Sequence, residues 1–363
     1  MKLLIITQRV DINDDNLGFF HRWLEKFSDK LEEVYVICLW QGEYDLPKNV
    51  HVFSLGKERG VSKIGQFVLL QKHLLEILPK VDGVFVHMCP IYAVAAWALA
   101  KIFRRKMILW FLHREVHWQL KLAEKCVAKI LTASKESCQL KNRRKIEIVG
   151  HGVDADFVKP LSGAKHQESN TFRIISVGRI SPIKDLLTLI KAMDILIYQK
   201  KVKDIEMQII GTPLGEDEEE YQKKLKEEVS KVYKLTPITS TEAKNLSGRI
   251  ITKGKPHREM AGIYQQSNLL VNLSPTGGMD KVVLEAMACA ILVLVCNETF
   301  RDDFGGYADV LIFQEKNPQD LAQKILNLKN LNAAEIGNHL RDRVVQKHNL
   351  DNLLNKIINV FQE

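Results

Sequence analysis

Short apolar runs rich in β-branched residues alternate with longer segments of helical period along the whole chain. Such runs are typical of strands buried on both faces, in a parallel sheet covered by two layers of helices. Seven runs lie in the first half, at residues 2–8, 34–39, 50–55, 83–87, 107–112, 129–133 and 146–149. Six follow in the second half, at 172–177, 206–210, 249–252, 269–272, 291–295 and 310–312. We therefore predict an α/β protein with two Rossmann-like, doubly wound parallel sheets.

Residues 158–171 are polar and lack periodicity, so we place the boundary between two domains there. The predicted N-terminal domain covers residues 1–160, and the second covers 171–345. Residues 346–363 form an amphipathic helical pattern with no strand after it. From the pattern alone, this helix can pack on either domain.

The composition fits a globular protein, since 46% of its 363 residues are hydrophobic and 26% are charged. The longest apolar stretches, 92–100 and 286–296, are about half the ~20 residues that a helix needs to cross a bilayer. The first residues lead directly into a predicted strand and lack the core of a signal peptide. Six cysteines without a Cys-x-x-Cys pair favour reduced thiols, and hence a cytoplasmic protein.

The net charge of +8 suits an anionic ligand, a membrane surface or nucleic acid. Basic clusters at 101–106 and 141–145 lie in the first half, and an acidic run lies at 216–220. We interpret each as a solvated face, with membrane contact through the basic N-terminal domain as the alternative. Nucleic-acid binding is disfavoured because aromatic residues do not alternate with the basic ones.

A first candidate site follows the predicted strand 172–177. Gly178 ends the strand, Arg179 follows, and Pro182 leads into a helical pattern after Lys184. Ligands of parallel sheets bind outside the carboxyl ends of the strands, and two cations beside a helix N-terminus suit a diphosphate. The alternative is a surface loop with two solvated cations.

A second candidate site follows the predicted strand 269–272. Gly277 and Gly278 lie in a loop of small residues before a helical pattern, and paired glycines let backbone N–H groups approach an anion. Glu285 falls inside the helix between apolar neighbours, where a buried carboxylate needs a partner such as a ribose diol. The alternative is an exposed helical glutamate.

Taken in order, these marks resemble the GT-B-fold retaining glycosyltransferases of family 4, also described as glycosyl transferases group 1. The matching segments of the second half are Val177-Gly178-Arg179 with Lys184, Gly211-Thr212-Pro213-Leu214, Tyr264 before Ser267-Asn268-Leu269, and Leu284-Glu285-Ala286-Met287-Ala288-Cys289. Those of the first half are Leu17-Gly18-Phe19-Phe20, Trp110-Phe111-Leu112-His113 and Gly152-Val153-Asp154.

The resemblance implies two domains facing across a cleft, with the last helix crossing back to the first domain. It implies that Arg179 and Lys184 bind the donor diphosphate and that Glu285 binds the nucleotide ribose. Gly18 would open a loop facing the donor, and His113 would sit beside the transferred sugar. The implied partners are a nucleoside-diphosphate-sugar and a glycan or lipid-linked acceptor of surface polysaccharide or glycolipid synthesis. No cofactor and no metal are expected.

The chain departs from the family pattern at the sugar end of this site. Gly277 stands where the family usually carries a glutamate that touches the sugar. Gly277, Gly278 and Met279 would therefore contribute only backbone amides, and Asp280 or Lys281 would supply the missing polarity. This departure keeps open the alternative of a non-catalytic nucleotide-sugar-binding or scaffolding protein. A GT-B epimerase or phosphorylase is a weaker alternative.

Three short motifs suggest competing chemistry, and we predict that none of them carries it. Asp154-Ala155-Asp156 has the form of a metal-binding Asp-x-Asp, but a motif of three residues arises easily by chance. His113 and His117 have a helical zinc spacing, yet His113 ends a strand-like run. Gly150-His151-Gly152 lacks the third glycine and the helix of a dinucleotide site.

Overall fold

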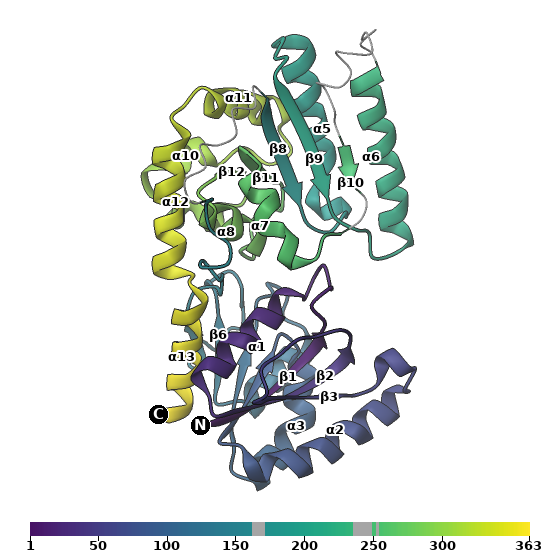
Figure 1. Cartoon of the computed structure of the whole chain (residues 1–363), viewed down its shortest axis with the longest axis vertical. Coiled ribbons are helices and arrows are strands. Elements are labelled where there is room, and N and C mark those ends of the chain that lie inside the picture. Colours follow the sequence, from purple (N-terminus) through teal and green to yellow (C-terminus); the bar gives the residue numbers. More distant parts are fainter. Residues whose placement is uncertain (162–170, 235–248, 252–253) are drawn as a thin grey trace. The chain divides into compact units, whose positions relative to one another are not determined.

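The computed structural model describes residues 1–161, 171–234, 249–251 and 254–363. These residues form two compact units (Figure 1). One contains Met1–Asp154, Pro256–Arg258 and His348–Glu363, and the other contains Ala155–Lys255 and Glu259–Lys347. Each unit has its own parallel sheet, which confirms the predicted α/β class.

The first unit has a seven-stranded sheet in the order β3-β2-β1-β4-β5-β6-β7, and every pairing in it is parallel. The order reverses direction between β1 and β4, as in doubly wound folds. The strands are β1 Lys2–Val10, β2 Glu33–Gln41, β3 Val50–Ser54, β4 Gly83–His87, β5 Lys106–Trp110, β6 Lys129–Thr132 and β7 Ile146–Ile148.

Helices cover both faces of this sheet, and the strand period of two decides which residues face which layer. In β1, Leu3 and Ile5 pack toward α1 Phe19–Lys30 and α13 Leu350–Gln362. Leu4 and Ile6 pack toward α2 Lys63–Ile77, α3 Pro90–Ile102 and α4 Trp118–Cys126. Two short 3-10 turns, η1 Lys57–Arg59 and η2 Leu78–Lys80, flank α2.

The second unit has a five-stranded sheet in the order β10-β9-β8-β11-β12, again parallel throughout. Its strands are β8 Phe172–Val177, β9 Ile205–Ile210, β10 Arg249–Ile251, β11 Leu269–Asn272 and β12 Leu292–Val295. The helical elements between β8 and β12 are η3 Pro182–Lys184, α5 Leu186–Asp194, the π-helical η4 Ile195–Gln199, α6 Glu216–Lys234, α7 His257–Gln265 and α8 Lys281–Ala288. After β12 come η5 Glu298–Phe300, α9 Arg301–Phe304, η6 Gly305–Tyr307, α10 Ala308–Leu311, α11 Pro318–Lys329 and α12 Ala333–Lys347.

The structure corrects one predicted strand. Residues 310–312 belong mostly to the short helix α10, and only Ile312 makes an isolated bridge, to Val295. A short apolar run has the same appearance in a buried strand and in a buried helical turn, so periodicity could not separate them. The predicted strand 249–252 appears as β10, while Thr252 and most of the predicted linker, 162–170, lie outside the described residues.

The last helix packs on the sheet of the first unit, as the resemblance implied. Its residues Leu353, Leu354 and Ile357 are buried in the same core as α1. Asp351 receives hydrogen bonds from Lys26 and Lys30 of α1, with N–O distances of 2.8 and 3.2 Å. Partial burial would raise the pKa of the Asp351 carboxyl, but these two ammonium groups outweigh it and lower the pKa.

The described residues can be compared with two expectations from the sequence, which concern membrane-spanning helices and the state of the cysteines. Among the described residues, every helix is too short or too polar to cross a bilayer. All six cysteines are described, and they are free thiols. Burial raises the pKa of the Cys38 and Cys289 thiols to about 12, so both stay protonated at neutral pH and pack as small apolar groups.

Gly152 is expected to control how closely α13 packs on the first unit. A Cβ added there would lie 2.5 Å from Cζ2 of Trp23 and 2.8 Å from Cδ2 of Leu353. Overpacking of this kind costs about 1–3 kcal/mol, so we expect Gly152→Ala to lower the free energy of unfolding by that amount in urea titrations. The control is Gly262→Ala, where a Cβ meets no atom within 4 Å. Equal stability of Gly152→Ala and wild type would contradict this packing.

Candidate functional site

The two glycine-containing loops predicted as a site meet at the carboxyl edge of the second sheet. They meet because β8 and β11 are neighbours in that sheet, so the chain leaves both strands at one edge. A small pocket lies there, lined by Ser176, Val177, Gly178, Arg179, Lys184, Leu186, Ile209, Asn272 and Leu273. The fold thus brings together two segments about a hundred residues apart in the sequence.

The loop after β8 is fixed by a close contact with the loop after β9. Gly178 has a φ of +136°, and its N–H donates to the Ile210 carbonyl at 3.0 Å. Gly211 approaches so closely that a Cβ on it would lie 1.8 Å from the Gly178 carbonyl oxygen. Glycine is required at both positions, one for its backbone conformation and the other for the close approach. The two glycine motifs of the sequence therefore form one structural unit.

Lys184 is held at the pocket by the second loop. Its Nζ donates to Oγ of Ser274 and to Oδ2 of Asp280, both at 2.7 Å. The same Oδ2 accepts from Nδ2 of Asn272 at 2.8 Å and from the Ser274 hydroxyl. Oδ2 of Asp280 thus accepts hydrogen bonds from three donors, and this network links Lys184 to the end of β11.

The ionisation of Asp280 follows from these partners. Burial would raise the pKa of its carboxyl, but the charge and hydrogen bond of Lys184, helped by Ser274 and Asn272, lower it below the ordinary 3.8. Asp280 is therefore ionised at neutral pH, and it balances one of the two cations at the pocket.

Arg179 has an anchor that the sequence did not indicate. Its Nε lies 3.3 Å from Oε1 of Glu218 in α6, while the Arg179 side chain remains 48% exposed. Oε2 of Glu218 accepts from the Leu214 N–H at 2.8 Å, which fixes the carboxylate. The sequence predicts a solvated face for the acidic run 216–220, but this member of it orients a site cation. No local signal in the sequence distinguishes Glu218 from its acidic neighbours.

Glu285 is buried at 3% exposure and is paired inside the protein. The Tyr264 hydroxyl donates to its Oε2 at 2.9 Å, and Nζ of Lys281 lies 3.3 Å from its Oε1. Burial and the neighbouring Glu285 charge raise the pKa of Tyr264 well above its ordinary value, so Tyr264 stays a donor. The sequence predicts that a buried Glu285 needs a partner, and Tyr264 belongs to a separate segment of the family resemblance. Only the structure shows that these two residues pair.

The loop of Gly277, Gly278 and Met279 is held through its carbonyl groups. Oγ1 of Thr299 donates to the Gly277 carbonyl at 3.0 Å, and Nδ2 of Asn297 donates to the Gly278 carbonyl at 2.8 Å. Both donors come from the segment around η5. Fixing the carbonyls fixes the peptide planes, so the loop presents its amides in one orientation.

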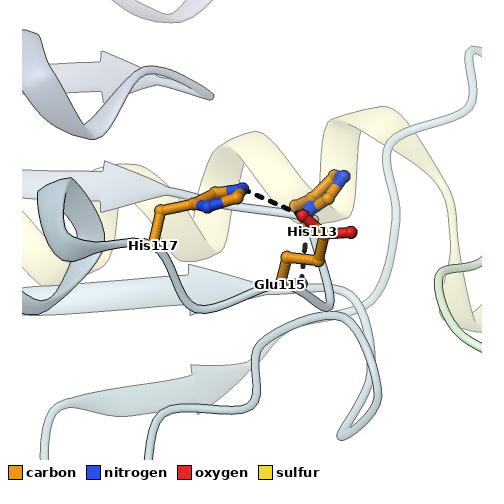
Figure 2. Close-up of side chains that lie close together, drawn as sticks. All are labelled: His113, Glu115 and His117. Carbon is orange, nitrogen blue, oxygen red and sulfur yellow. Dashed lines mark hydrogen bonds and ion pairs between the residues drawn. The ribbon is translucent and has the colours of Figure 1, made fainter.

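The two candidate residues of the first unit follow its own strands. Gly18 is buried at the start of α1, and a Cβ on it would lie 2.3 Å from the Asp14 carbonyl oxygen. His113 follows β5 in an exposed loop with Glu115 and His117, shown in Figure 2. Strand ends of a parallel sheet share one edge, so both residues lie at the carboxyl edge of the first sheet.

The loop of His113 brings three potential metal ligands within 4.8 Å of one another. Glu115 forms an ion pair with Nε2 of His117 at 3.1 Å, and the Glu115 N–H donates to Nδ1 of His113 at 3.2 Å. Because Nδ1 of His113 accepts, the proton of the neutral ring is on Nε2, which makes that atom a donor to a ligand.

The Asp-x-Asp segment has a structural use. Oδ2 of Asp154 accepts from Nε and Nη2 of Arg22 in α1, at 3.0 and 2.7 Å. The Asp154 side chain is almost fully buried, and the guanidinium is the kind of partner that such a carboxylate requires. Arg22 and Asp154 both belong to the first unit, so their contact has a structural role there.

Comparison with known proteins identifies the fold and a family whose model matches part of the chain. Residues 171–330 match the family model described as "Glycosyl transferases group 1". The fold is that of Anabaena Alr3699/HepE in complex with UDP, at 15% identity and a TM-score of 0.75 over 100% of both chains. It is also that of sucrose-phosphate synthase from Thermosynechococcus elongatus, at 13% identity and a TM-score of 0.73 over 100% of this chain and 98% of that one. The chain therefore has the GT-B fold.

The chain is also similar in sequence to a curated protein. It is the poly(ribitol-phosphate) alpha-N-acetylglucosaminyltransferase of Staphylococcus aureus (strain COL), 24% identical over 216 residues. The match covers 57% of this chain, and it spans only 38% of the length of that relative.

Asp280 is expected to contribute a pH-dependent part of the stability. Its carboxyl has a lowered pKa in the folded state, so its contribution is complete above the ordinary pKa of 3.8 and is lost as the pH falls through the lowered value. We expect the difference in free energy of unfolding between wild type and Asp280→Asn to shrink on acidification, measured by urea titrations at several pH values. The exposed Asp302→Asn is the control. A difference that does not change with pH would contradict the pairing with Lys184.

Proposed function

We propose that the protein is a glycosyltransferase that moves a sugar from a nucleoside-diphosphate-sugar to a glycan or lipid-linked acceptor. The observation that carries the proposal is the placement of Arg179 and Lys184 at one pocket, beside the loop that leads into α8. Two cations and a fixed loop of backbone amides are suited to a diphosphate. The match of residues 171–330 to glycosyl transferases group 1 supports the same assignment.

The site binds the donor phosphate by exchanging partners. Without a ligand, Lys184 is paired with Asp280, and Arg179 is paired with Glu218. A diphosphate brings more negative charge than either carboxylate, and both ammonium and guanidinium groups make charge-assisted hydrogen bonds to phosphate oxygens. Before the phosphate binds, Asp280 and Glu218 hold the two cations in position at the pocket.

We propose a retaining, metal-independent transfer. The bond from the sugar carbon to the diphosphate oxygen breaks, and the acceptor oxygen forms its bond on the same face of the sugar. The leaving diphosphate oxygen takes the proton of the acceptor. Arg179 and Lys184 stabilise the negative charge that grows on the leaving group, a form of electrostatic catalysis worth several kcal/mol.

For the nucleotide, we propose uridine diphosphate, with its ribose at Glu285. The Glu285 carboxylate is oriented by Tyr264 and Lys281, and an oriented carboxylate is a suitable acceptor for ribose hydroxyls. The uridine assignment is supported by Alr3699/HepE, whose structures contain UDP and UDP-glucose.

At the sugar end, we assign His113 to a hydroxyl of the transferred sugar through its Nε2–H. Gly18 would open the loop that faces the donor. Gly277, Gly278 and Met279 contribute backbone amides, with Asp280 and Lys281 as the nearest charged groups along the chain. The acceptor would belong to surface polysaccharide or glycolipid synthesis, at the cytosolic face of a membrane.

The second candidate is a non-catalytic nucleotide-sugar-binding or scaffolding protein. It is favoured by one observation, Gly277 in the place of the usual glutamate. Such a protein would bind the nucleotide and show no turnover, which separates it from a transferase.

Uridine diphosphate is expected to protect the protein against thermal unfolding. A ligand at about 100 times its Kd stabilises the native state by about 2.7 kcal/mol. Arg179→Ala and Lys184→Ala each remove a charge-assisted contact of about 1.5–3 kcal/mol, so each should weaken UDP binding roughly 10- to 100-fold by calorimetry. Lys191→Ala, an exposed lysine of α5, is the matched control. Unchanged UDP affinity in both site variants would overturn the phosphate assignment.

Transfer itself is expected with a uridine-diphosphate-sugar, and the first donors to test are UDP-glucose and UDP-N-acetylglucosamine. Release of UDP should require an acceptor and should fall in Lys184→Ala by at least the factor seen in binding. The reaction should continue in EDTA, since the cations replace a metal. Binding without any UDP release across donors and acceptors would favour the non-catalytic candidate, and loss of activity in EDTA would contradict the metal-free mechanism.

The ribose assignment can be tested with a matched pair of ligands. Wild type should bind UDP more tightly than 2′,3′-dideoxy-UDP, because only UDP offers hydroxyl donors to Glu285. In Glu285→Gln this preference should shrink by about 1–3 kcal/mol in a double-mutant cycle by calorimetry. The same preference in both proteins would place the ribose elsewhere.

A further inference from the structure

The first unit exposes apolar side chains on the outward side of three helices, α2, α3 and α4. We call this surface the α2–α4 face. Its exposed large hydrophobic residues are Ile64, Phe67, Val68 and Leu75 of α2, Ile91, Trp97 and Ile102 of α3, and Trp118 and Leu122 of α4. Isolated exposed hydrophobic residues are normal on a protein surface, but nine of them on three neighbouring helices indicate an interaction site.

The three helices present one continuous surface because their inner sides pack on the same face of the sheet. Leu70 and Leu74 of α2, Ala93 of α3, and Leu120 and Ala123 of α4 belong to one buried cluster. α3 contacts both α2 and α4, and Figure 1 shows α2 and α3 lying together on the side of the sheet away from α1. The outward residues of the three helices therefore share a surface.

The exposure on this face is large. Ile64 is 79% exposed, Phe67 is 53% exposed and Trp118 is 63% exposed. Ile64, Phe67 and Val68 have the i, i+3, i+4 spacing that places side chains together on a helix surface. Because α2 also buries Leu70 and Leu74, it is apolar on its inner and its outer side. A helix with apolar side chains on its outer as well as its inner side is suited to contact a second apolar surface.

Charge indicates what covers the face. The three helices contain five lysines and two glutamates, so the face is cationic as well as apolar. Lys63, Lys72, Lys101, Lys121 and Lys125 are exposed, and Lys101 lies over the Trp97 ring at 5.2 Å. Lysine is depleted at protein interfaces, whereas lysine next to tryptophan is typical of the boundary between lipid and water.

The basic clusters noted in the sequence contribute less to this surface than their density suggests. Arg105 donates to the Leu78 carbonyl, Lys106 to the Val360 carbonyl, and Lys145 to the carbonyls of Glu124 and Val127. These cations stabilise loops and helix ends within the first unit. The lysines of the α2–α4 face are spread along three helices, and only Lys101 belongs to one of those sequence clusters.

We propose that the α2–α4 face docks on an anionic lipid bilayer, with its apolar side chains in the headgroup region and its lysines beside lipid phosphates. The helices have 15, 13 and 9 residues, below the ~20 needed to span, so the protein lies on the membrane surface. α2, α3 and α4 follow the carboxyl ends of β3, β4 and β5 along the chain. The docked face therefore borders the sheet edge that carries His113. Docking would bring a lipid-linked acceptor to that edge, although lipid binding itself does not require sugar transfer.

The test is sedimentation of the whole protein with vesicles of phosphatidylcholine, with and without phosphatidylglycerol, in the absence of nucleotide. We expect binding to the anionic vesicles, a loss of binding at high salt, and a blue shift of tryptophan emission. Ile64→Ser combined with Phe67→Ser should weaken binding at least tenfold. Lys121→Glu combined with Lys125→Glu should weaken binding to anionic vesicles by at least roughly tenfold, since each lysine near such a surface contributes about fivefold.

Controls separate this proposal from stability and from sugar transfer. Ile148→Ser removes an exposed apolar side chain of the same unit outside the three helices and should bind vesicles as wild type does. Arg179→Ala should also bind normally, so a failure of the proposed reaction leaves this result intact. Circular dichroism checks the fold of each variant. Absence of wild-type binding to anionic vesicles overturns the proposal, and so does binding by both double variants that equals that of wild type. So does a dimer in solution that the Ile64 and Phe67 substitutions dissociate, since a second copy of the chain would then cover the face.

Discussion

The contact between Lys184 and Asp280 is the interaction on which the site depends. It joins the loop after β8 to the loop after β11, and with Ser274 and Asn272 it forms a network around one carboxylate oxygen. A lysine with four rotatable carbon bonds loses much side-chain entropy when it is fixed at a pocket. Lys184, Ser274 and Asn272 together lower the pKa of Asp280 even though burial of the carboxylate would raise it.

Other charged side chains of the site are also oriented by ion pairs and hydrogen bonds. Glu218 of α6 holds Arg179, and Tyr264 of α7 holds Glu285 together with Lys281 of the same helix α8, so Arg179 and Glu285 are each oriented by a neighbour from another element. Glycine provides the space for these elements to meet, because Gly211 approaches the Gly178 carbonyl where a side chain would collide. Orientation before the ligand arrives reduces the entropy that binding must overcome. In the first unit, the buried pair of Arg22 with Asp154 and the packing of α13 on α1 serve the stability of the scaffold.

Much of the fold could be predicted because a buried parallel strand has a strong local pattern. Twelve of the thirteen expected strands appear, and the exception, residues 310–312, shows the limit of that pattern. The site was predictable where a motif follows a strand, as for Arg179, Lys184 and Glu285. Glu218 was not predictable, because its sequence neighbours make it look like part of a solvated acidic face. Its role arises from the return of α6 toward the loop after β8, a long-range contact.

The sequence by itself determined the two parallel sheets, the edges at which ligands bind and the residues that carry charge to those edges. These properties follow from the alternation of strands and helices and from the rule that parallel strands end at one edge. Only the tertiary structure decided which charges are paired, that α13 packs on the first sheet, and that the outward sides of α2, α3 and α4 form one apolar and cationic surface. The physical reason is that pairing and exposure depend on contacts between segments far apart in the chain, which local periodicity does not encode.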